Sequence, residues 1–147
     1  VYAEHNTLYC SSNHQIASLT EKADIRQAVA DSRKVTRSYL EGEDLFPLDS
    51  DHSVNHASVE FLEAAAIMLL GGGHIGFLPN HYAKMWEKTG QLVPILCEEY
   101  TYTSEFYIVT RKSLRRSVIV GTFMEDLEIA IAEINERLGT GKMTATA

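Results

Sequence analysis

Two histidines and two carboxylates lie close together in the sequence, at His52, His56, Asp49 and Asp51. Histidines four residues apart bind a metal ion when a helix places them on one face. Here residues 51–55 have the composition of a loop that leads into a strand, where residues four apart do not converge. The helical HExxH pattern is also absent. The sequence therefore predicts neither a metal site nor a cofactor.

Cys97 with His74 or His81 is a second arrangement that could carry chemistry, because a thiol and an imidazole can form a nucleophile and its base. The surrounding residues match no GxSxG elbow and no catalytic cysteine signature. No pair of carboxylates is spaced around a glycine-lined segment. Structural histidines are the simpler interpretation, so we predict no catalytic residue and no enzyme activity.

The glycines at 71–73 and Gly76 resemble a phosphate-binding loop in composition. Such loops follow a strand and precede a helix, whereas these glycines follow a helix and precede a strand. We therefore expect a helix end and a tight turn. Phe77, Tyr82 and Trp86 have the spacing of core or interface residues rather than of a stacking platform.

The composition indicates one globular domain with a packed core: 147 residues, 45% hydrophobic and 22% charged. A net charge of -7 disfavours direct binding to nucleic acid. Cys10 and Cys97 are expected to be reduced thiols, with a single disulfide as the alternative. The longest apolar run, Ala64 to Leu70, is too short for a membrane span, and no signal peptide pattern opens the chain.

Strands alternating with helices predict an α/β fold with a mainly parallel sheet flanked by helices. Ser58 is the expected N-cap of a central helix that ends at Leu70, and Pro79 begins the next helix. In parallel sheets, strand-to-helix turns line a crevice that binds small ligands, and helix N-termini there favour anions. The expected strands are 6–10, 34–36, 74–78, 92–96 and 106–109, and the expected helices begin at 20, 58, 79 and 117.

Residues 63–83, with the sequence EAAAIMLLGGGHIGFLPNHYA, and the following Gly90-Gln91-Leu92 closely resemble the effector-binding domain of LysR-type transcriptional regulators. Residues 8–14 are similar to the hinge strand and turn of that family, although Ser11 and Gln15 replace its usual glycine and proline. Residues 35–40 and 106–109 resemble two further strands. The resemblance covers nearly the whole chain, to about Leu138.

The resemblance implies a two-lobed α/β domain like that of periplasmic binding proteins, preceded by a helix-turn-helix domain that binds DNA. Residues 1–147 would form a partial effector-binding domain. Residues 11–103 would be the second lobe, 5–10 and 104–110 the hinge strands, 115–138 the last helix of the first lobe, and 139–147 a flexible tail. Aligned with the family, the chain lacks the DNA-binding region and most of the first lobe, so we expect either that it was truncated or that a partner covers its exposed face.

The resemblance also implies a set of effector contacts. They are Ser12, Thr36, Arg37, Ser38, Asn55, His56, Ser58, Gly76 and Phe77. Arg37 and a helix start at Ser58 would suit an anionic effector, because a guanidinium and free backbone N–H groups bind carboxylates. The alternative is that Arg37 only balances the acidic residues between 41 and 44.

The implied function is regulation of transcription by a small-molecule effector in the cytoplasm, without a membrane. A homodimer or homotetramer would bind DNA only through the missing N-terminal domain. Effector binding would shift the arrangement of the lobes. Residues 58–70 and 123–138 would be helices at the interface between protomers or, alternatively, ordinary core helices. A solute-binding protein of a transport system and a small α/β enzyme are the alternative functions.

Overall fold

The computed structural model describes residues 2–38, 56–111 and 117–138. Contacts divide the chain into two compact units, one of residues 4–104 and one of residues 1–3 with 105–147. The elements are β1 (Tyr2–Ser11), η1 (Gln15–Ser18), α1 (Lys22–Asp31), β2 (Lys34–Arg37), β3 (His56–Val59), α2 (Leu62–Leu70), β4 (Ile75–Pro79), α3 (Asn80–Lys88), β5 (Leu92–Pro94), β6 (Thr101–Phe106) and α4 (Val118–Leu138).

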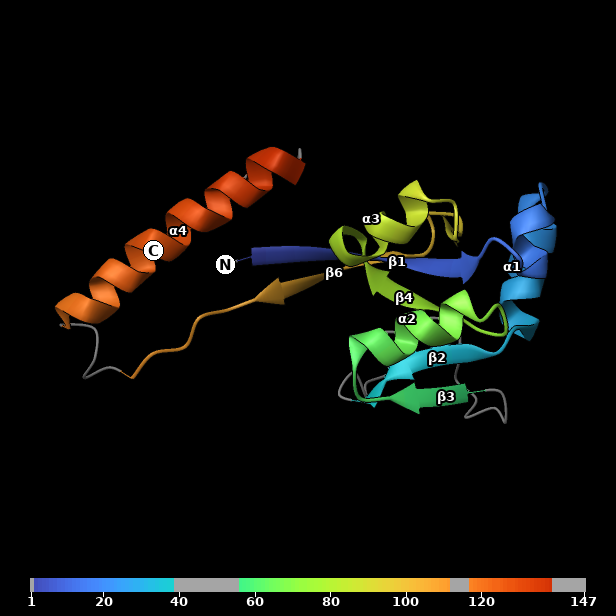
Figure 1. The fold of residues 1–147 in the computed structure, drawn as a ribbon, viewed down its shortest axis with the longest axis horizontal. Helices are drawn as coiled ribbons and strands as arrows, with labels where there is room; N and C mark the ends of the chain where they lie inside the picture. Colours follow the sequence, from blue (N-terminus) through green and yellow to red (C-terminus); the bar gives the residue numbers. More distant parts are fainter. Residues whose placement is uncertain (1, 39–55, 112–116, 139–147) are drawn as a thin grey trace. The chain divides into compact units, whose positions relative to one another are not determined.

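The described strands form one mixed sheet in the order β3-β2-β4-β1-β5, with β6 also paired to β1. β2 runs parallel to β3 and β4, and Val35 is the ladder partner of both Ala57 and Gly76. β1 runs antiparallel to β4 and β5, so its arrow points the opposite way to those of β2, β3 and β4 in Figure 1. The parallel arrangement expected from the alternation of strands and helices therefore holds for β2, β3 and β4, while β1 reverses it.

Each face of the sheet carries its own hydrophobic core, because successive side chains of a strand point to opposite faces. On one face, α2 packs on β2 and β4, and α3 packs on β4 and β5. We call this the α2 side; its buried residues are Tyr9, Val35, Ala65, Ala66, Leu69, Leu78, Ala83 and Leu92. On the other face, α1 and η1 contribute to a second cluster, and we call this the α1 side; its buried residues are Leu8, Cys10, Ile16, Val29, Ile75, Ile95 and Tyr100.

The start of the central helix differs from the sequence-based prediction. Ser58 lies inside β3, as the ladder partner of Thr36, and α2 begins only at Leu62 with Phe61 as its N-cap. The prediction of Ser58 as N-cap is therefore wrong. The alternation of polar and apolar residues in His56–Val59 is a strand pattern, with the half-buried Ala57 and Val59 packed on the α2 side.

Glycines lie at the ends of two helices, one of them at the predicted place. Gly71 caps α2, and Gly72 has a φ of +79°, which confirms the expected helix end and tight turn at 71–73. Gly90 follows α3 with a φ of +68°. Gly76 has another role, because a Cβ atom there would lie 2.8 Å from the Val35 carbonyl oxygen and 2.9 Å from Val35 Cγ1.

The strand expected at 106–109 lies earlier in the chain, as β6 at Thr101–Phe106. Polar side chains pair β6 with β1: His5 Nδ1 lies 2.9 Å from Thr103 Oγ1, and Thr7 Oγ1 lies 3.1 Å from Thr101 Oγ1. The apolar residues 106–109 suggested a strand, but the strand that pairs with β1 is the segment that contains Thr101 and Thr103. Tyr107, Ile108 and Val109 are exposed and lie outside any strand.

The predicted final helix is confirmed as α4, a 21-residue helix. Several of its large apolar side chains are exposed, among them Val118, Ile119, Phe123 and Ile129. Of the helices in the described segments, none combines the length and apolar character needed to cross a membrane.

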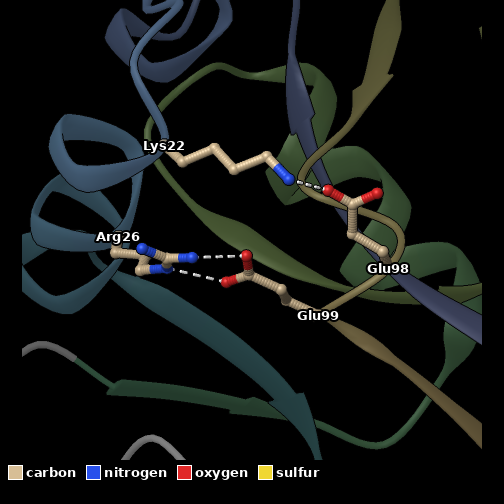
Figure 2. A network of polar contacts seen from close by, with 4 residues as sticks. All are labelled: Lys22, Arg26, Glu98 and Glu99. Atoms are coloured by element: carbon tan, nitrogen blue, oxygen red, sulfur yellow. Dashed lines mark hydrogen bonds and ion pairs between the residues drawn. The ribbon is translucent and has the colours of Figure 1, made fainter.

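Two ion pairs join α1 to the segment between β5 and β6, as Figure 2 shows. Arg26 binds Glu99 in a bidentate manner, with Nε donating to Oε2 at 2.8 Å and Nη2 to Oε1 at 2.7 Å. Lys22 pairs with Glu98 beside it. The hydrogen bonds from Arg26 lower the pKa of the Glu99 carboxyl, and Glu99 in turn raises the pKa of Arg26.

The Glu99 pair predicts a pH dependence of stability. A carboxyl whose folded pKa is lowered stabilises the fold above its unfolded pKa of about 4.3, and this contribution disappears as the pH falls through the folded value. We expect Glu99→Gln to lower the melting temperature slightly at pH 7, with the difference from the unmodified chain closing as the pH falls below about 4. Melting curves measured from pH 7 to pH 3 check this. Glu60→Gln, which removes an exposed carboxylate, is the control, and a gap that stays constant with pH would contradict the assignment.

The close contact at Gly76 predicts a strong effect of a single methyl group. Gly76→Ala should lower the free energy of unfolding by about 1–3 kcal/mol, because the Val35 backbone has to move to admit the Cβ atom. Urea denaturation measures this change. Gly73→Ala is the matched control, since a Cβ at Gly73 meets nothing within 4 Å. Equal stability of the two variants would show that β2 and β4 are not held in close contact.

The position of Ser58 in a strand predicts that it does not cap α2. Loss of an N-cap serine costs about 1 kcal/mol, whereas an exposed strand serine contributes little. Ser58→Ala should therefore change the free energy of unfolding by less than about 0.5 kcal/mol. Urea denaturation measures this change. A loss of about 1 kcal/mol would instead indicate that Ser58 caps a helix.

Candidate functional site

The strands β2, β3 and β4 end at one edge of the sheet, because they are parallel. We call this the carboxyl edge; Arg37 and Val59 are ladder partners there, and Pro79 ends β4. Since β1 is antiparallel, its early residue Asn6 pairs with Pro79 and lies at the same edge. Residues of four strands thus meet at the edge where open α/β sheets bind ligands, with Arg37 and Asn6 as the polar ones among those named.

Ser12 is separated from these residues. It follows the far end of β1, and its backbone N–H donates to the carbonyl of Gln91 at 3.0 Å. We expected the turns after all strands to line one crevice, which requires β1 to run parallel to β2. That expectation is wrong, because β1 is antiparallel to β4, and β4 is parallel to β2. The structure places Ser12 at the edge opposite to Thr36 and Arg37.

Four of the predicted contacts do come together. Thr36 and Ser58 are ladder partners, and the Thr36 hydroxyl is hydrogen-bonded to Nε2 of His56. Phe77 packs with the α1-side cluster. From the register of β2 with β4, Thr36 lies beside Phe77 on that same side. We define the candidate site as Asn6, Thr36, His56, Ser58 and Phe77, all on the α1 side of the sheet. His56 begins β3 and joins this group through its hydrogen bond to Thr36.

Arg37 points to the other face. Its ladder partner Val59 packs on the α2 side, and Arg37 is only 9% exposed. The structure therefore does not bring Arg37 and Ser58 together on one face, and Ser58 offers no helix N-terminus. Ser38 follows β2 and is half-buried. Asn55 and the acidic residues at 41–44 lie outside the described residues, so the two interpretations of Arg37 both stay predictions.

Asn6 was missed by the sequence analysis. It is completely buried, and its Nδ2 donates to the Glu4 carbonyl at 3.3 Å and to Ser104 Oγ at 3.4 Å. Its Oδ1 atom has no hydrogen-bond partner among the described residues. The available signal was a lone asparagine before the apolar run Leu8-Tyr9-Cys10, because a polar amide in a buried strand needs an explanation.

Gly76 and Phe77 differ in what they can offer a ligand. Gly76 is buried inside the sheet between its ladder partners Val35 and Tyr9, where its role is to allow close packing. Phe77 is half-buried, and its ring meets that of Tyr102 edge to face, with centroids 5.1 Å apart. An aromatic edge next to hydroxyl and imidazole groups suits a small molecule with both polar and apolar parts.

The other chemical groups are dispersed. Within the described segments, no three histidine, cysteine or acidic residues are grouped to hold a metal ion, and His52, Asp49 and Asp51 lie outside those segments. His81 Nδ1 lies 3.8 Å from a Glu4 carboxylate oxygen.

Both cysteines are free thiols, as expected from the sequence. Cys97 is exposed. Cys10 is buried, and burial raises the pKa of its thiol to about 11. At neutral pH the Cys10 thiol is therefore protonated and a poor nucleophile.

Comparison with known proteins places this geometry in a family. The family model of the LysR substrate binding domain matches residues 1–130. The HTH-type transcriptional activator BauR of Pseudomonas aeruginosa is 35% identical over 133 residues, which cover 88% of this chain and 42% of BauR. This chain thus spans less than half the length of BauR.

Two solved structures share the fold. The effector domain of the regulator AmpR of Pseudomonas aeruginosa has a TM-score of 0.61 at 16% identity, covering 93% of this chain and 66% of that one. The bromide-bound regulatory domain of HypT from Salmonella typhimurium has a TM-score of 0.60 at 15% identity, covering 90% and 63%. They confirm the predicted α/β fold of LysR effector domains. Together with the family match over residues 1–130, they lead to one conclusion: the chain belongs to the LysR substrate binding domain family.

Proposed function

We propose that this chain is the effector-sensing domain of a LysR-type transcriptional regulator, which binds a small metabolite at the candidate site and thereby controls DNA binding by a helix-turn-helix domain of the full-length protein. The observation that carries the proposal is the family match over residues 1–130. The similarity to a transcriptional activator favours this role over solute transport, which uses a related fold. No residue is given a catalytic role.

The groups of the candidate site suit a small polar effector. Thr36, His56 and Ser58 supply hydroxyl and imidazole groups, and the half-buried Phe77 supplies an apolar wall. The case for an anionic effector rested on Arg37 and on a helix start at Ser58. The helix starts at Leu62 instead, and Arg37 lies on the α2 side. Bromide binding by the HypT regulatory domain is the remaining reason to include anions among the compounds tested.

The division into lobes follows from the same proposal. Residues 11–103, which lie within the compact unit of residues 4–104, would be the second lobe, with Ser12 and Gly76 in its framework. Residues 5–10 and 104–110 would be the hinge strands, and α4 the last helix of the first lobe. The full-length protein would act as a homodimer or homotetramer in the cytoplasm. Its effector would shift the arrangement of the lobes only as far as it binds one arrangement more tightly than the other.

The experiment uses the full-length protein that contains this sequence. A metabolite panel is screened by thermal shift, and each compound that raises the melting temperature is tested for its effect on binding to promoter DNA. At least one compound should change the affinity for DNA. If compounds bind but DNA binding never responds, the proposed regulatory function is wrong.

Thr36→Val tests where the effector binds. Valine keeps the shape of threonine and removes the hydroxyl, so the effector affinity should fall about tenfold, the loss expected for one hydrogen bond. Isothermal titration measures the affinity. Thr103→Val is the matched control, because Thr103 also pairs with a histidine, His5, but by strand alternation His5 points to the opposite face of β1 from Asn6. Equal affinities in both variants would place the effector elsewhere.

A further inference from the structure

Asn6 carries an acceptor atom that finds no donor in the described part of the chain. The residue is 0% exposed, and Oδ1 meets no donor among the described residues. A buried acceptor that has lost its water and gained no partner opposes folding, and such atoms are rare in native proteins. The two bonds of Nδ2, at 3.3 and 3.4 Å, are longer than usual, so they hold the amide only loosely.

The location of Asn6 connects this atom to the candidate site. By strand alternation Asn6 lies on the same side of β1 as Leu8, whose ladder partner is Phe77. Asn6 itself pairs with Pro79 at the carboxyl edge. The unused oxygen therefore belongs to the same side and edge of the sheet as Phe77 and Thr36.

One same-side neighbour of Asn6 along β1, Glu4, also carries acceptors. Glu4, two residues earlier and on the same side of the strand, has a carboxylate that is mostly buried, with His81 Nδ1 at 3.8 Å. A carboxylate and a free amide oxygen together complement hydrogen-bond donors rather than anions. This part of the edge therefore selects for the donor groups of a ligand.

We propose that Asn6 is an effector-binding residue whose Oδ1 accepts a hydrogen bond from an amine, amide or hydroxyl group of the effector. This inference rests on the proposed sensing function and names the chemistry of its ligand. The oxygen is covered in the free chain, so the effector reaches it only when the surrounding side chains move. The hydrogen bond between the effector and Oδ1 then favours the rearranged, effector-bound state of the protein over the effector-free state.

A purely structural role for Asn6 makes a different prediction. If its purpose is to join β1 to β6, the essential group is Nδ2, which donates to Ser104. If its purpose is to bind the effector, the essential group is Oδ1. Asn6→Asp keeps an acceptor oxygen and removes the donor, whereas Asn6→Leu removes both with little change in shape.

The experiment measures melting temperatures of the full-length protein that contains this sequence. The probes are ethanolamine, acetamide and acetate at up to about 100 mM, with ionic strength held constant. Ethanolamine and acetamide carry donors, and acetate carries only acceptors. We expect the two donor probes to stabilise the unmodified protein and Asn6→Asp, and to lose at least about tenfold in apparent affinity in Asn6→Leu. Acetate should give no shift that depends on Asn6.

Thr7→Val is the matched control, because Thr7 lies next to Asn6, is equally buried, and has its hydroxyl paired with Thr101. It should leave the probe response intact. Without any probe, Asn6→Leu should melt at or above the temperature of the unmodified protein, since it removes an unsatisfied acceptor. A melting temperature well below that of Thr7→Val would overturn the proposal in favour of a structural role.

Three further results would also overturn it: an unchanged probe response in Asn6→Leu, a folded Asn6→Asp protein that has lost the response, and donor probes that do not stabilise the unmodified protein. An Asn6→Leu protein that does not fold counts as a melting temperature well below that of Thr7→Val and overturns the proposal in the same way. Failure of the proposed function looks different, because the probes would bind through Asn6 while DNA binding stayed constant.

Discussion

The close approach of β2 and β4 at Gly76 is the constraint on which the candidate site depends. With no side chain at this position, the Val35 backbone can lie where a Cβ atom would be only 2.8 Å away. This contact fixes Val35 opposite Gly76, and the alternation of side chains then puts Thr36 beside Phe77 on the α1 side. A slip of one residue in this register would turn Thr36 to the α2 side and place Val35 in the site.

The same alternation explains why neighbouring residues have different roles. Thr36 and Arg37 are adjacent in sequence, yet their side chains point to opposite faces of the sheet. Thr36 bonds to His56 on the α1 side, while Arg37 pairs with Val59, which packs under α2. A sequence comparison that assigns a run of consecutive strand residues to a ligand site therefore assigns too many residues, because only every second residue of a strand faces that site.

The sequence was sufficient to predict the fold class and most of the elements, but not β3, the position of β6 or the direction of β1. Helix ends at Gly72 and Gly90 have strong local causes, as does the amphipathic pattern of α4. The direction of β1 depends on its long-range pairing with β4, and no local pattern encodes it. The resemblance placed Ser12 in the site although it follows the far end of β1, and Asn6, at the other end of the β1 pairing with β4, was overlooked. The start of α2 was misplaced because a serine before an apolar stripe also fits a strand that alternates.

The α1 side of the sheet is divided between a packed half and a half with polar groups. Around Ile75 and Cys10, the side chains of α1 and η1 complete a core, and the bidentate Arg26–Glu99 pair holds α1 to the chain between β5 and β6. Around Thr36, Phe77 and Asn6, the same face carries hydroxyl, imidazole and amide groups, one of them with an unused acceptor. Residues of β4 take part in both halves, with Ile75 in the first and Phe77 in the second. A ligand that binds in the polar half therefore contacts a strand, β4, whose other end is already fixed by packing. Its binding free energy is spent on ordering the side chains at the carboxyl edge, because the sheet is already formed.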